Sequence, residues 1–334
     1  MKSMEIRLRK RPVGMPEVDD FEIVEVETPE PNASGEVLIR NVSLTVDPYM
    51  RGRMIDRQSY VPGFQLNETL TGGAIGKVVA SSHSEFQVGD YVESHLGWRE
   101  AFVSTGRGLR KLGSLNAPPS AYLGVLGMPG MTAYVGLLEV GKLREGEFVF
   151  VSGAAGAVGS AVGQIAKIKN CTAVGSAGSS EKVRHLTEDL GFDHAFDYHD
   201  GHLERQILAG APQGIDVYFD NVGGDHLQAA LNCMRPNGRL PLCGAISQYN
   251  ATAPVPGPNN LAIAIGSQLT LQGFIVSNYN HLRDDFMRDM TDWVVSGRLK
   301  YRETVFNGIE NMPKAFIGLF TGENTGKMIV NLTD

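Results

Sequence analysis

Three regularly spaced glycines, Gly153, Gly156 and Gly159, lie between a short apolar run and a stretch with helical periodicity. In a dinucleotide-binding loop the first glycine allows a tight turn, the second lets the backbone approach a pyrophosphate, and the third lets the helix pack closely. The amino end of that helix then faces the anion. Glycine- and alanine-rich turns also occur where helices simply pack on strands, so the spacing alone is weak evidence. The correct flanking elements make a dinucleotide site the favoured interpretation.

The residues after the next apolar run indicate which dinucleotide is bound. An NAD site needs a carboxylate about 20 residues after the glycines, where it accepts hydrogen bonds from the ribose hydroxyls. Residues 175–180 are instead small or hydroxylated, and Lys182 follows them. A 2′-phosphate would find donors and a cation there, and Glu181 is the one discordant charge. We therefore expect NADPH. A simpler interpretation, a solvated helix start capped by Ser179 or Ser180, is compatible with that expectation.

The sequence offers no set of metal ligands. Zinc needs three or four Cys, His or carboxylate side chains that converge on one point. The first 120 residues contain no cysteine and only His83 and His95, which lack ligand spacing. His199 and His202 lie near His194, but we interpret their segment as a solvated surface loop. Without a Lewis acid the natural substrate is a conjugated double bond, whose β-carbon accepts hydride while one hydrogen-bond donor stabilises the enolate.

Composition sets the broad class of protein. A chain of 334 residues exceeds one usual globular core, so two domains are expected. A net charge of -7 without any basic block argues against nucleic-acid binding. The N-terminus becomes charged at Lys2 and no uncharged apolar run approaches the roughly 20 residues that span a bilayer, so neither a signal peptide nor membrane association is expected. Three cysteines without paired spacing, Cys171, Cys233 and Cys243, indicate reduced thiols in a cytoplasmic protein.

Two patterns divide the chain. Up to about residue 120, short apolar runs between prolines and glycines predict a compact β-rich domain, with strands at 37–44 and 72–79 and a Gly-Asp turn before a short apolar run within 86–92. From about residue 146 to 276, apolar runs alternate with helical stretches, which is typical of a doubly wound parallel sheet. The strands expected there are 148–151, 172–175, 215–220, 239–243 and 269–276, and the expected helices are 160–170 and 181–190. The tail after about residue 293 returns to mixed β character and is expected to rejoin the first domain.

Several segments together resemble one family. They are residues 47–54, 127–134, 154–167, 220–224, 243–250 and 271–276. In this order, and essentially from end to end, the chain is similar to the zinc-independent alkenal/one oxidoreductases of the medium-chain dehydrogenase/reductases. Segments 249–252 and 256–258 look closest to the bacterial curcumin reductase branch. The resemblance implies an α/β fold, in which a doubly wound Rossmann cofactor domain (125–294) is inserted into a β-rich, GroES-like catalytic domain (1–124) that residues 295–334 rejoin.

The resemblance also implies the site residues. Tyr249 matches the tyrosine assigned to the substrate carbonyl, and a phenol with a pKa near ~10 is neutral at pH 7 and can donate to a developing enolate oxygen. Whether it passes on its proton or solvent protonates the α-carbon stays open, and a strand-end tyrosine at a domain edge is the structural alternative. Tyr60 matches an aromatic that lines the substrate site, and its structural alternative is an ordinary loop tyrosine. Tyr49 could line the cleft, and its structural alternative is a buried Asp-Pro turn. The positions that match cofactor contacts are Gly156, Ala157, Val158, Gly159, Lys182, Tyr198, Asn221, Cys243, Gly244, Ala245, Ile246, Ser247, Phe274, Ile275, Val276 and Asn324.

These features predict an NADPH-dependent reductase of enones and enals, whether curcumin-like, lipid-derived or small alkenals. A homodimer is expected because the family forms them. Residues 56–70 and 247–260 are expected to shape the substrate pocket. Two alternatives remain: an NADPH-dependent quinone reductase on the same fold, which needs no proton donor placed as Tyr249, and a non-catalytic NADPH-binding protein.

Overall fold

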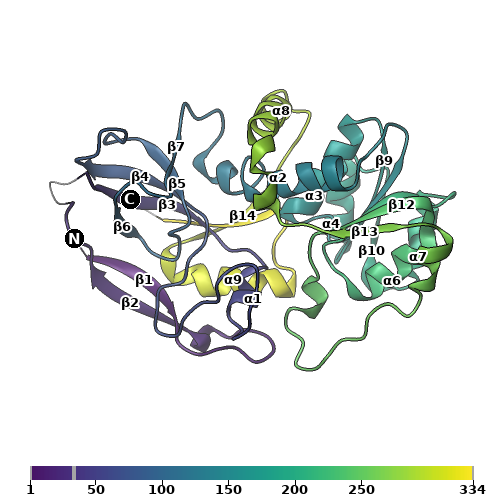
Figure 1. Cartoon of the computed structure of the whole chain (residues 1–334), viewed down its shortest axis with the longest axis horizontal. Coiled ribbons are helices and arrows are strands. Elements are labelled where there is room, and N and C mark those ends of the chain that lie inside the picture. Colours follow the sequence, from purple (N-terminus) through teal and green to yellow (C-terminus); the bar gives the residue numbers. More distant parts are fainter. Residues whose placement is uncertain (1, 32–34, 333–334) are drawn as a thin grey trace. The chain divides into compact units, whose positions relative to one another are not determined.

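The computed structural model describes residues 2–31 and 35–332, which pack into two compact units (Figure 1). The first unit contains the chain up to Leu123, then Glu303–Asn324 and the residues from Met328 onward. The second contains Gly124–Arg302 and Thr325–Lys327. The first unit is therefore built from both ends of the chain, and the second from its middle.

The first unit is rich in β-structure. In its described residues a seven-stranded sheet has the order β14-β15-β3-β4-β5-β7, with β6 also paired to β3. A separate antiparallel hairpin joins β1 (Lys2–Leu8) and β2 (Phe21–Glu27). The sheet strands are β3 (Val37–Thr45), β4 (Ala74–Ser81), β5 (Tyr91–Ser94), β6 (Ala101–Ser104), β7 (Arg110–Leu112), β14 (Glu303–Asn307) and β15 (Lys327–Asn331). The helices are η1 (Val18–Asp20), α1 (Met50–Arg53), η2 (Pro119–Leu123), η8 (Ile309–Asn311) and α9 (Met312–Thr321).

The C-terminal segment completes the core of the first unit. Phe316 on α9 packs edge-on against the rings of Phe21 and Trp98, which stack on one another 5.7 Å apart. Strand β15 pairs antiparallel with β3, and Ser43 Oγ donates a hydrogen bond of 2.8 Å to Asn331 Oδ1. Because these partners come from opposite ends of the sequence, the apolar core closes only when the tail returns.

The second unit is a doubly wound parallel sheet. Its strands are β8 (Phe148–Val151), β9 (Thr172–Ala177), β10 (His194–Asp197), β11 (Ile215–Phe219), β12 (Met234–Leu242) and β13 (Thr270–Gly273). They are arranged in the order β10-β9-β8-β11-β12-β13, and neighbouring strands pair in parallel. The chain thus runs outward from β8 in one direction and from β11 in the other, which confirms the expected α/β, Rossmann fold class.

Helical segments connect these strands. They are α2 (Met128–Val135), η3 (Gly136–Val140), α3 (Ala157–Ile168), α4 (Ser180–Arg184), η4 (His185–Asp189), η5 (Tyr198–Asp200), α5 (Leu203–Gly210), α6 (Gly224–Cys233), η6 (Ile246–Gln248), α7 (Ala262–Gly266), η7 (Val276–Leu282) and α8 (Arg283–Val295). The unit ends at Arg302, beyond α8. No helix in the described part of the chain is long and apolar enough to cross a bilayer. Within residues 2–31 and 35–332, no group of three or more His, Cys, Asp or Glu side chains is arranged to hold a metal ion.

Three expected elements differ from the structure. The strand expected at 269–276 ends at Gly273, because Phe274 turns its ring edge-on to Phe219 and the chain then enters η7. The helix expected at 181–190 divides into α4 and the π-helical segment η4. The loop expected around His199 contains the short helix η5, whose N-cap Asp197 accepts a hydrogen bond from the His199 backbone N–H.

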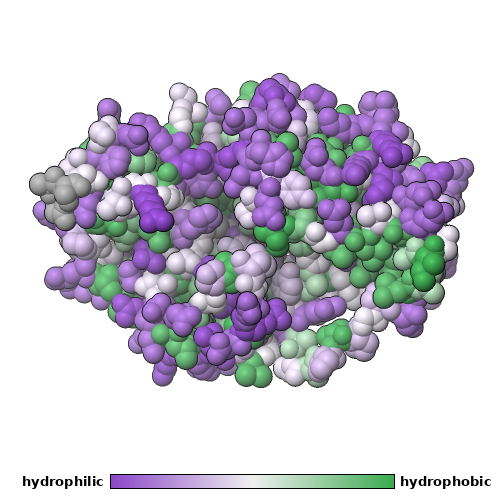
Figure 2. All heavy atoms as spheres, viewed as in Figure 1, coloured by the Kyte–Doolittle hydropathy of each residue, from purple (hydrophilic) through white to green (hydrophobic). Residues whose placement is uncertain are grey.

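Exposed apolar side chains gather beside β13, the last strand of the parallel sheet. On and before α7, Leu261 is 49% exposed and Ile265 is 82% exposed. Figure 2 shows this apolar area over α7, at the right-hand end of the view. Among the described residues, β13 pairs with β12 alone and so ends the parallel sheet.

Candidate active site

The candidate site lies where the second unit's sheet changes direction. Strands β8 and β11 are neighbours, and the chain leaves them toward opposite ends of the sheet. The loops that follow them touch: a Cβ placed on Gly153 would lie 3.5 Å from Val222 Cγ2 and 3.6 Å from Asn221 Cβ. Ligands of doubly wound sheets bind at such a switch point, outside the carboxyl ends of the strands.

The glycine loop presents the start of α3 to this point. Gly153 has a φ of +60°, which favours glycine, and Gly156 is the N-cap of α3. No side chain caps α3, and its first turn, which includes Ala157 and Val158, carries no acidic residue. The backbone N–H groups of that turn can therefore bind an anion, and this geometry fits a pyrophosphate.

Gly159 fixes how closely α3 approaches the loop. A Cβ there would lie 2.5 Å from Gly153 O and 2.7 Å from Ala154 Cα, both backbone atoms. We expect Gly159→Ala to lower the free energy of unfolding by about 1–3 kcal/mol, as overpacking does, and to weaken NADPH binding. Thermal melting and titration with NADPH measure the two effects. Gly266→Ala is the matched control, since a Cβ at Gly266 meets nothing within 4 Å; equal behaviour of the two variants would contradict the expectation.

The loop after β9 leads into α4, whose first turn contains Lys182. Ser179 is the N-cap of α4 and its hydroxyl accepts a hydrogen bond of 3.3 Å from the Lys182 N–H, which confirms the capping interpretation. Burial lowers the pKa of the Lys182 ammonium, and the neighbouring Glu181 opposes this shift. Glu181, the discordant charge, lies 4.0 Å from the Arg302 guanidinium. A half-buried ammonium regains favourable charge pairing when a phosphate binds beside it.

Tyr198, after β10, lies against the same loop. A Cβ on Gly178 would stand 3.1 Å from the Tyr198 hydroxyl, so this side chain and the start of α4 share one corner of the unit. The Tyr198 ring packs edge-on against His226, with centroids 5.4 Å apart, and its centroid lies 4.1 Å from that of His199. The structure therefore places Tyr198 beside Gly178, four residues before Lys182.

His226 beneath Tyr198 gives the folded state a pH dependence. Its Nε2 atom is buried without a hydrogen-bond partner among the described residues. Burial lowers the pKa of His226 to about 4, although Asp225 opposes the shift. The unfolded chain then binds a proton at pH 5 that the folded chain does not, so stability falls as pH drops from about 6.5 toward 4.

We expect His226→Phe to remove most of this dependence. The histidine should account for about 2 kcal/mol of stability lost between pH 7 and pH 5. Urea unfolding at both pH values measures the difference. His95→Phe, at an exposed histidine of the first unit, serves as control. An equal loss of stability in wild type and His226→Phe would refute the assignment.

Asn221 and the loop after β12 meet at the switch point. Asn221 Nδ2 donates to Ser152 O over 2.8 Å, and Asn221 O accepts from Ile246 N over 3.3 Å. Ser247 donates to Val222 O from both its backbone N–H (3.2 Å) and its hydroxyl (2.6 Å). These bonds join the turn after β11 to residues 243–249, so the structure brings these predicted cofactor contacts together.

The hydroxyl of Tyr249 lies inside this loop. It accepts a hydrogen bond of 3.3 Å from Ala245 N, and a Cβ on Gly244 would lie 3.1 Å from it. Gly244 directly follows Cys243, which lines a pocket. The phenol is therefore positioned at the end of β12, on the segment that borders this pocket.

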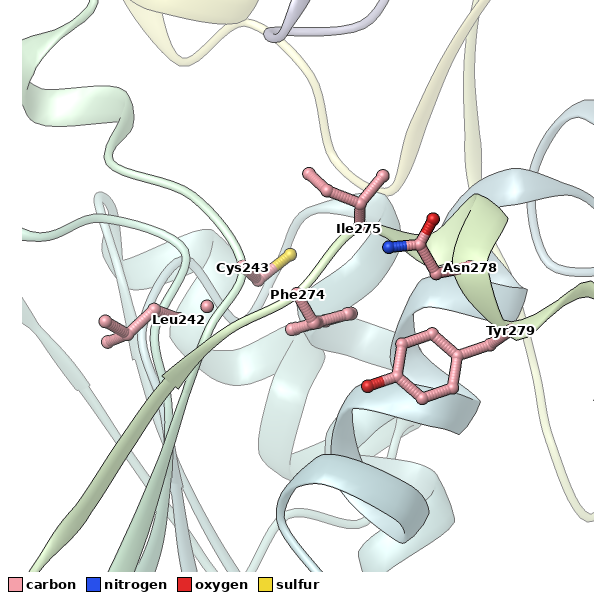
Figure 3. A pocket seen from close by; sticks show the side chains of 7 residues that line it. Leu242, Cys243, Phe274, Ile275, Asn278 and Tyr279 are labelled. Carbon is pink, nitrogen blue, oxygen red and sulfur yellow. The ribbon is translucent and has the colours of Figure 1, made fainter. Parts of the chain in front are cut away.

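An open pocket of about 610 Å³ lies at the carboxyl ends of β12 and β13 (Figure 3). The residues that line it are Leu242, Cys243, Gly273, Phe274, Ile275, Asn278 and Tyr279. Figure 3 shows the Cys243 thiol and the Asn278 amide directed toward one another, with the Phe274 and Tyr279 rings beside them. The walls combine apolar side chains with polar groups, and Asn278 supplies an amide that can donate and accept.

Sequence reasoning found only part of this lining. Cys243, Phe274 and Ile275 were expected, and Val276 starts η7 directly after them. Asn278 and Tyr279 were missed because the strand was expected to continue to residue 276. In the structure the strand ends at Gly273 and the chain enters η7. The positions of Asn278 and Tyr279, four and five residues beyond Phe274, were the available signal.

The two remaining tyrosines belong to the first unit. Tyr49 is the N-cap of α1 and forms a side-chain hydrogen bond with Arg53. Burial raises the pKa of Tyr49, and the negative charge of Asp47 raises it further. Asp47 is buried and accepts from Thr45 Oγ1 over 3.0 Å, so the Asp-Pro turn that was the structural alternative is present. Tyr60 is 66% exposed and interacts electrostatically with Tyr49 and Arg53.

Asn324 comes directly before Thr325–Lys327, the short segment that belongs to the second unit. There Gly326 N donates to Ala155 O of the glycine loop over 2.7 Å. The returning tail therefore contacts the glycine loop at Gly326, two residues beyond Asn324.

A doubly wound sheet with a glycine loop at its switch point and a pocket at the carboxyl ends of β12 and β13 is typical of a dinucleotide-dependent oxidoreductase. The profile described as N-terminal domain of oxidoreductase matches residues 4–112, and the one described as Zinc-binding dehydrogenase matches residues 157–296. The NADPH-dependent curcumin reductase of Escherichia coli is 44% identical over 330 residues, 97% of this chain and 95% of that protein.

Two further proteins are similar over nearly their whole length. The 2-alkenal reductase (NADP(+)-dependent) of Nicotiana tabacum is 41% identical over 339 residues, 99% of this chain and 97% of that protein. The crystal structure of CurA from Vibrio vulnificus in complex with NADPH superposes with a TM-score of 0.93 at 42% identity and 99% coverage of both chains. The chain belongs to the alkenal/one oxidoreductase family of medium-chain dehydrogenase/reductases, together with the curcumin and 2-alkenal reductases.

Proposed function

We propose that this protein uses NADPH to reduce the α,β double bond of enones and enals. The observation that carries the proposal is the position of the Tyr249 hydroxyl beside Gly244, on the segment that borders the pocket. Relatives of the chain support it, since one is an NADPH-dependent curcumin reductase and another a 2-alkenal reductase.

The residues fit NADPH at three places. The first turn of α3, with Gly156, Ala157, Val158 and Gly159, would bind the pyrophosphate. Lys182 and Tyr198 would hold the 2′-phosphate, while Asn221, residues 243–247 and residues 274–276 would surround the nicotinamide ribose and ring. Asn324 would add a contact from the returning tail. When bound, NADPH supplies the hydride that the substrate's β-carbon accepts.

Protein side chains then provide the rest of the chemistry. Tyr249 donates a hydrogen bond to the carbonyl oxygen as that oxygen gains enolate charge, and the α-carbon finally takes up a proton. The rings of Phe274 and Tyr279 and the side chain of Ile275 keep water away from the reacting carbons. In the first unit, which we assign as the catalytic domain, Tyr49 and Tyr60 would contact the substrate.

The test is a spectrophotometric screen of NADPH oxidation. Curcumin-like, lipid-derived and small enones and enals form one arm, quinones a second, and NADH replaces NADPH in a third. We expect turnover with enones and enals and preference for NADPH. Faster turnover of quinones than of every enone would indicate a quinone reductase, and no oxidation with any acceptor would indicate a non-catalytic protein.

We also infer that two copies form a homodimer through the free edge of β13. Exposed backbone on β13 and the neighbouring apolar surface of Leu261 and Ile265 support this surface. Light scattering coupled to gel filtration should give twice the monomer mass, and Ile265→Glu, which puts a charge in the exposed apolar surface, should reduce it to the mass of one chain. A monomeric wild type would contradict the dimer.

The three free cysteines support a cytoplasmic location, which cell fractionation tests.

A further inference from the structure

A buried carboxylate lies beneath the loops of the candidate site. Asp220 directly follows β11, and only 2% of its surface is exposed. Its Oδ1 atom accepts four hydrogen bonds, from Tyr218 Oη (2.7 Å), Gly223 N (2.7 Å), Val222 N (3.0 Å) and Ser152 Oγ (3.3 Å). A buried carboxylate is stable when several hydrogen-bond donors converge on it in this way. The same hydrogen bonds restrain the positions of the four donor groups.

The main chain of Asp220 binds the second loop. Its carbonyl oxygen accepts from Cys243 N over 2.9 Å and from Gly244 N over 3.0 Å, and its N–H donates to Pro241 O over 3.0 Å. One residue thus holds the turn after β11 with its side chain and the segment after β12 with its backbone. The Tyr249 hydroxyl rests on this second segment, beside Gly244.

Ser152 extends the same cluster to the glycine loop. Its hydroxyl accepts from Asn221 N over 3.0 Å and lies 3.0 Å from Tyr218 Oη, whose one hydrogen is shared between Ser152 and Asp220. Ser152 directly precedes Gly153, so three loops at the switch point share one buried polar cluster. Burial raises the pKa of Asp220, and the donors around it oppose that shift.

We propose that Asp220 is a positioning residue that sets the conformation of residues 221–224 and 243–249, and through them the cofactor contacts and Tyr249. Its carboxylate acts on the reaction only through the backbone that it holds. The proposal rests on the proposed function, because it concerns the same site.

Its test compares Asp220→Ala with Asp220→Asn. The asparagine oxygen can accept the same four hydrogen bonds, whereas alanine accepts none. Amide hydrogen exchange of the cofactor-free protein is followed in peptides covering 221–224 and 243–249, and NADPH affinity is measured by fluorescence titration. In the alanine variant, loss of the buried acceptor should speed amide exchange in both segments and weaken NADPH binding at least about tenfold. In the asparagine variant, both quantities should change less than about threefold.

Asp216→Asn is the matched control at the opposite end of β11, where the carboxylate accepts from Phe148 N over 2.9 Å. Faster exchange throughout β8–β12 in Asp220→Ala, or unchanged exchange in the two segments, would overturn the proposal. Should the alanine variant fail to fold, Tyr218→Phe and Ser152→Ala each remove one donor, and exchange at 221–224 must rise in both. Exchange and NADPH affinity need no substrate, so a wild type inactive on enones would defeat the proposed function while leaving this result standing.

Discussion

Lys182→Ala is expected to raise the KM for NADPH about 100-fold and to leave the KM for NADH within a factor of three. The removed ammonium is half-buried at the start of α4, where its loss of solvent is already reflected in a lowered pKa. Charge-assisted hydrogen bonds to a phosphate contribute about 1.5–3 kcal/mol, which corresponds to roughly ten- to 150-fold in affinity. Initial rates at saturating enone, with each cofactor varied in turn, measure the change.

Lys169→Ala is the control for this prediction. Lys169 belongs to the same unit, but it is exposed and lies 5.6 Å above the Trp293 ring. Its removal should change neither KM. If Lys182→Ala kept the wild-type preference for NADPH, another cation such as Arg302 would have to bind the 2′-phosphate.

Tyr249→Phe is expected to lower kcat for enones about 100-fold while the affinity for NADPH stays the same. Removing one donor to a developing oxyanion typically costs 10²–10³ in kcat. The phenol accepts the Ala245 N–H over a long 3.3 Å, while the loop is also held by backbone hydrogen bonds to Asp220 and Asn221, so the substitution should leave the loop folded. Single-turnover rates with bound NADPH separate this chemical step from cofactor binding.

The same chemical change at Tyr134 provides the control. Tyr134 donates its hydroxyl hydrogen to Asp289 over 2.8 Å and packs against Phe286, so Tyr134→Phe should affect stability and not kcat. Undiminished enone turnover in Tyr249→Phe would mean that the enolate is stabilised without this phenol. That outcome would favour solvent as the proton source, or a quinone as the substrate.

Local sequence patterns were sufficient for the fold class and the phosphate loop. The glycine spacing at 153–159 and the apolar strands are short-range signals, since turn, helix start and strand follow one another within about 20 residues. The N-cap at Ser179 is equally local. The family resemblance supplied Tyr198, Asn221 and Tyr249, which composition could not have indicated.

Tertiary packing decided what the sequence could not show. Asn278 and Tyr279 reach the pocket because the Phe274 ring packs edge-on between Phe219 and Tyr279. These contacts join residues from different elements of the fold. Asp220 was expected only as the last residue of the strand at 215–220, and its hydrogen bonds with Tyr218 and Ser152, which come from two neighbouring strands, make it a buried anchor. Such positions depend on several elements at once, so no spacing rule marks them.

The thiol in the pocket wall has a consequence for an enzyme of enones. Substrates with a conjugated carbonyl are soft electrophiles that alkylate cysteines, and the thiolate is the form that they attack. Burial, and then the negative charge of Asp220, raise the pKa of Cys243 to about 12. At pH 7 about one thiol in 10⁵ is then ionised, so the sulfur can line the pocket without being consumed by what enters it. Burial of the thiol, with the Asp220 carboxylate as the second cause, is therefore expected to slow its alkylation by enones that enter the pocket.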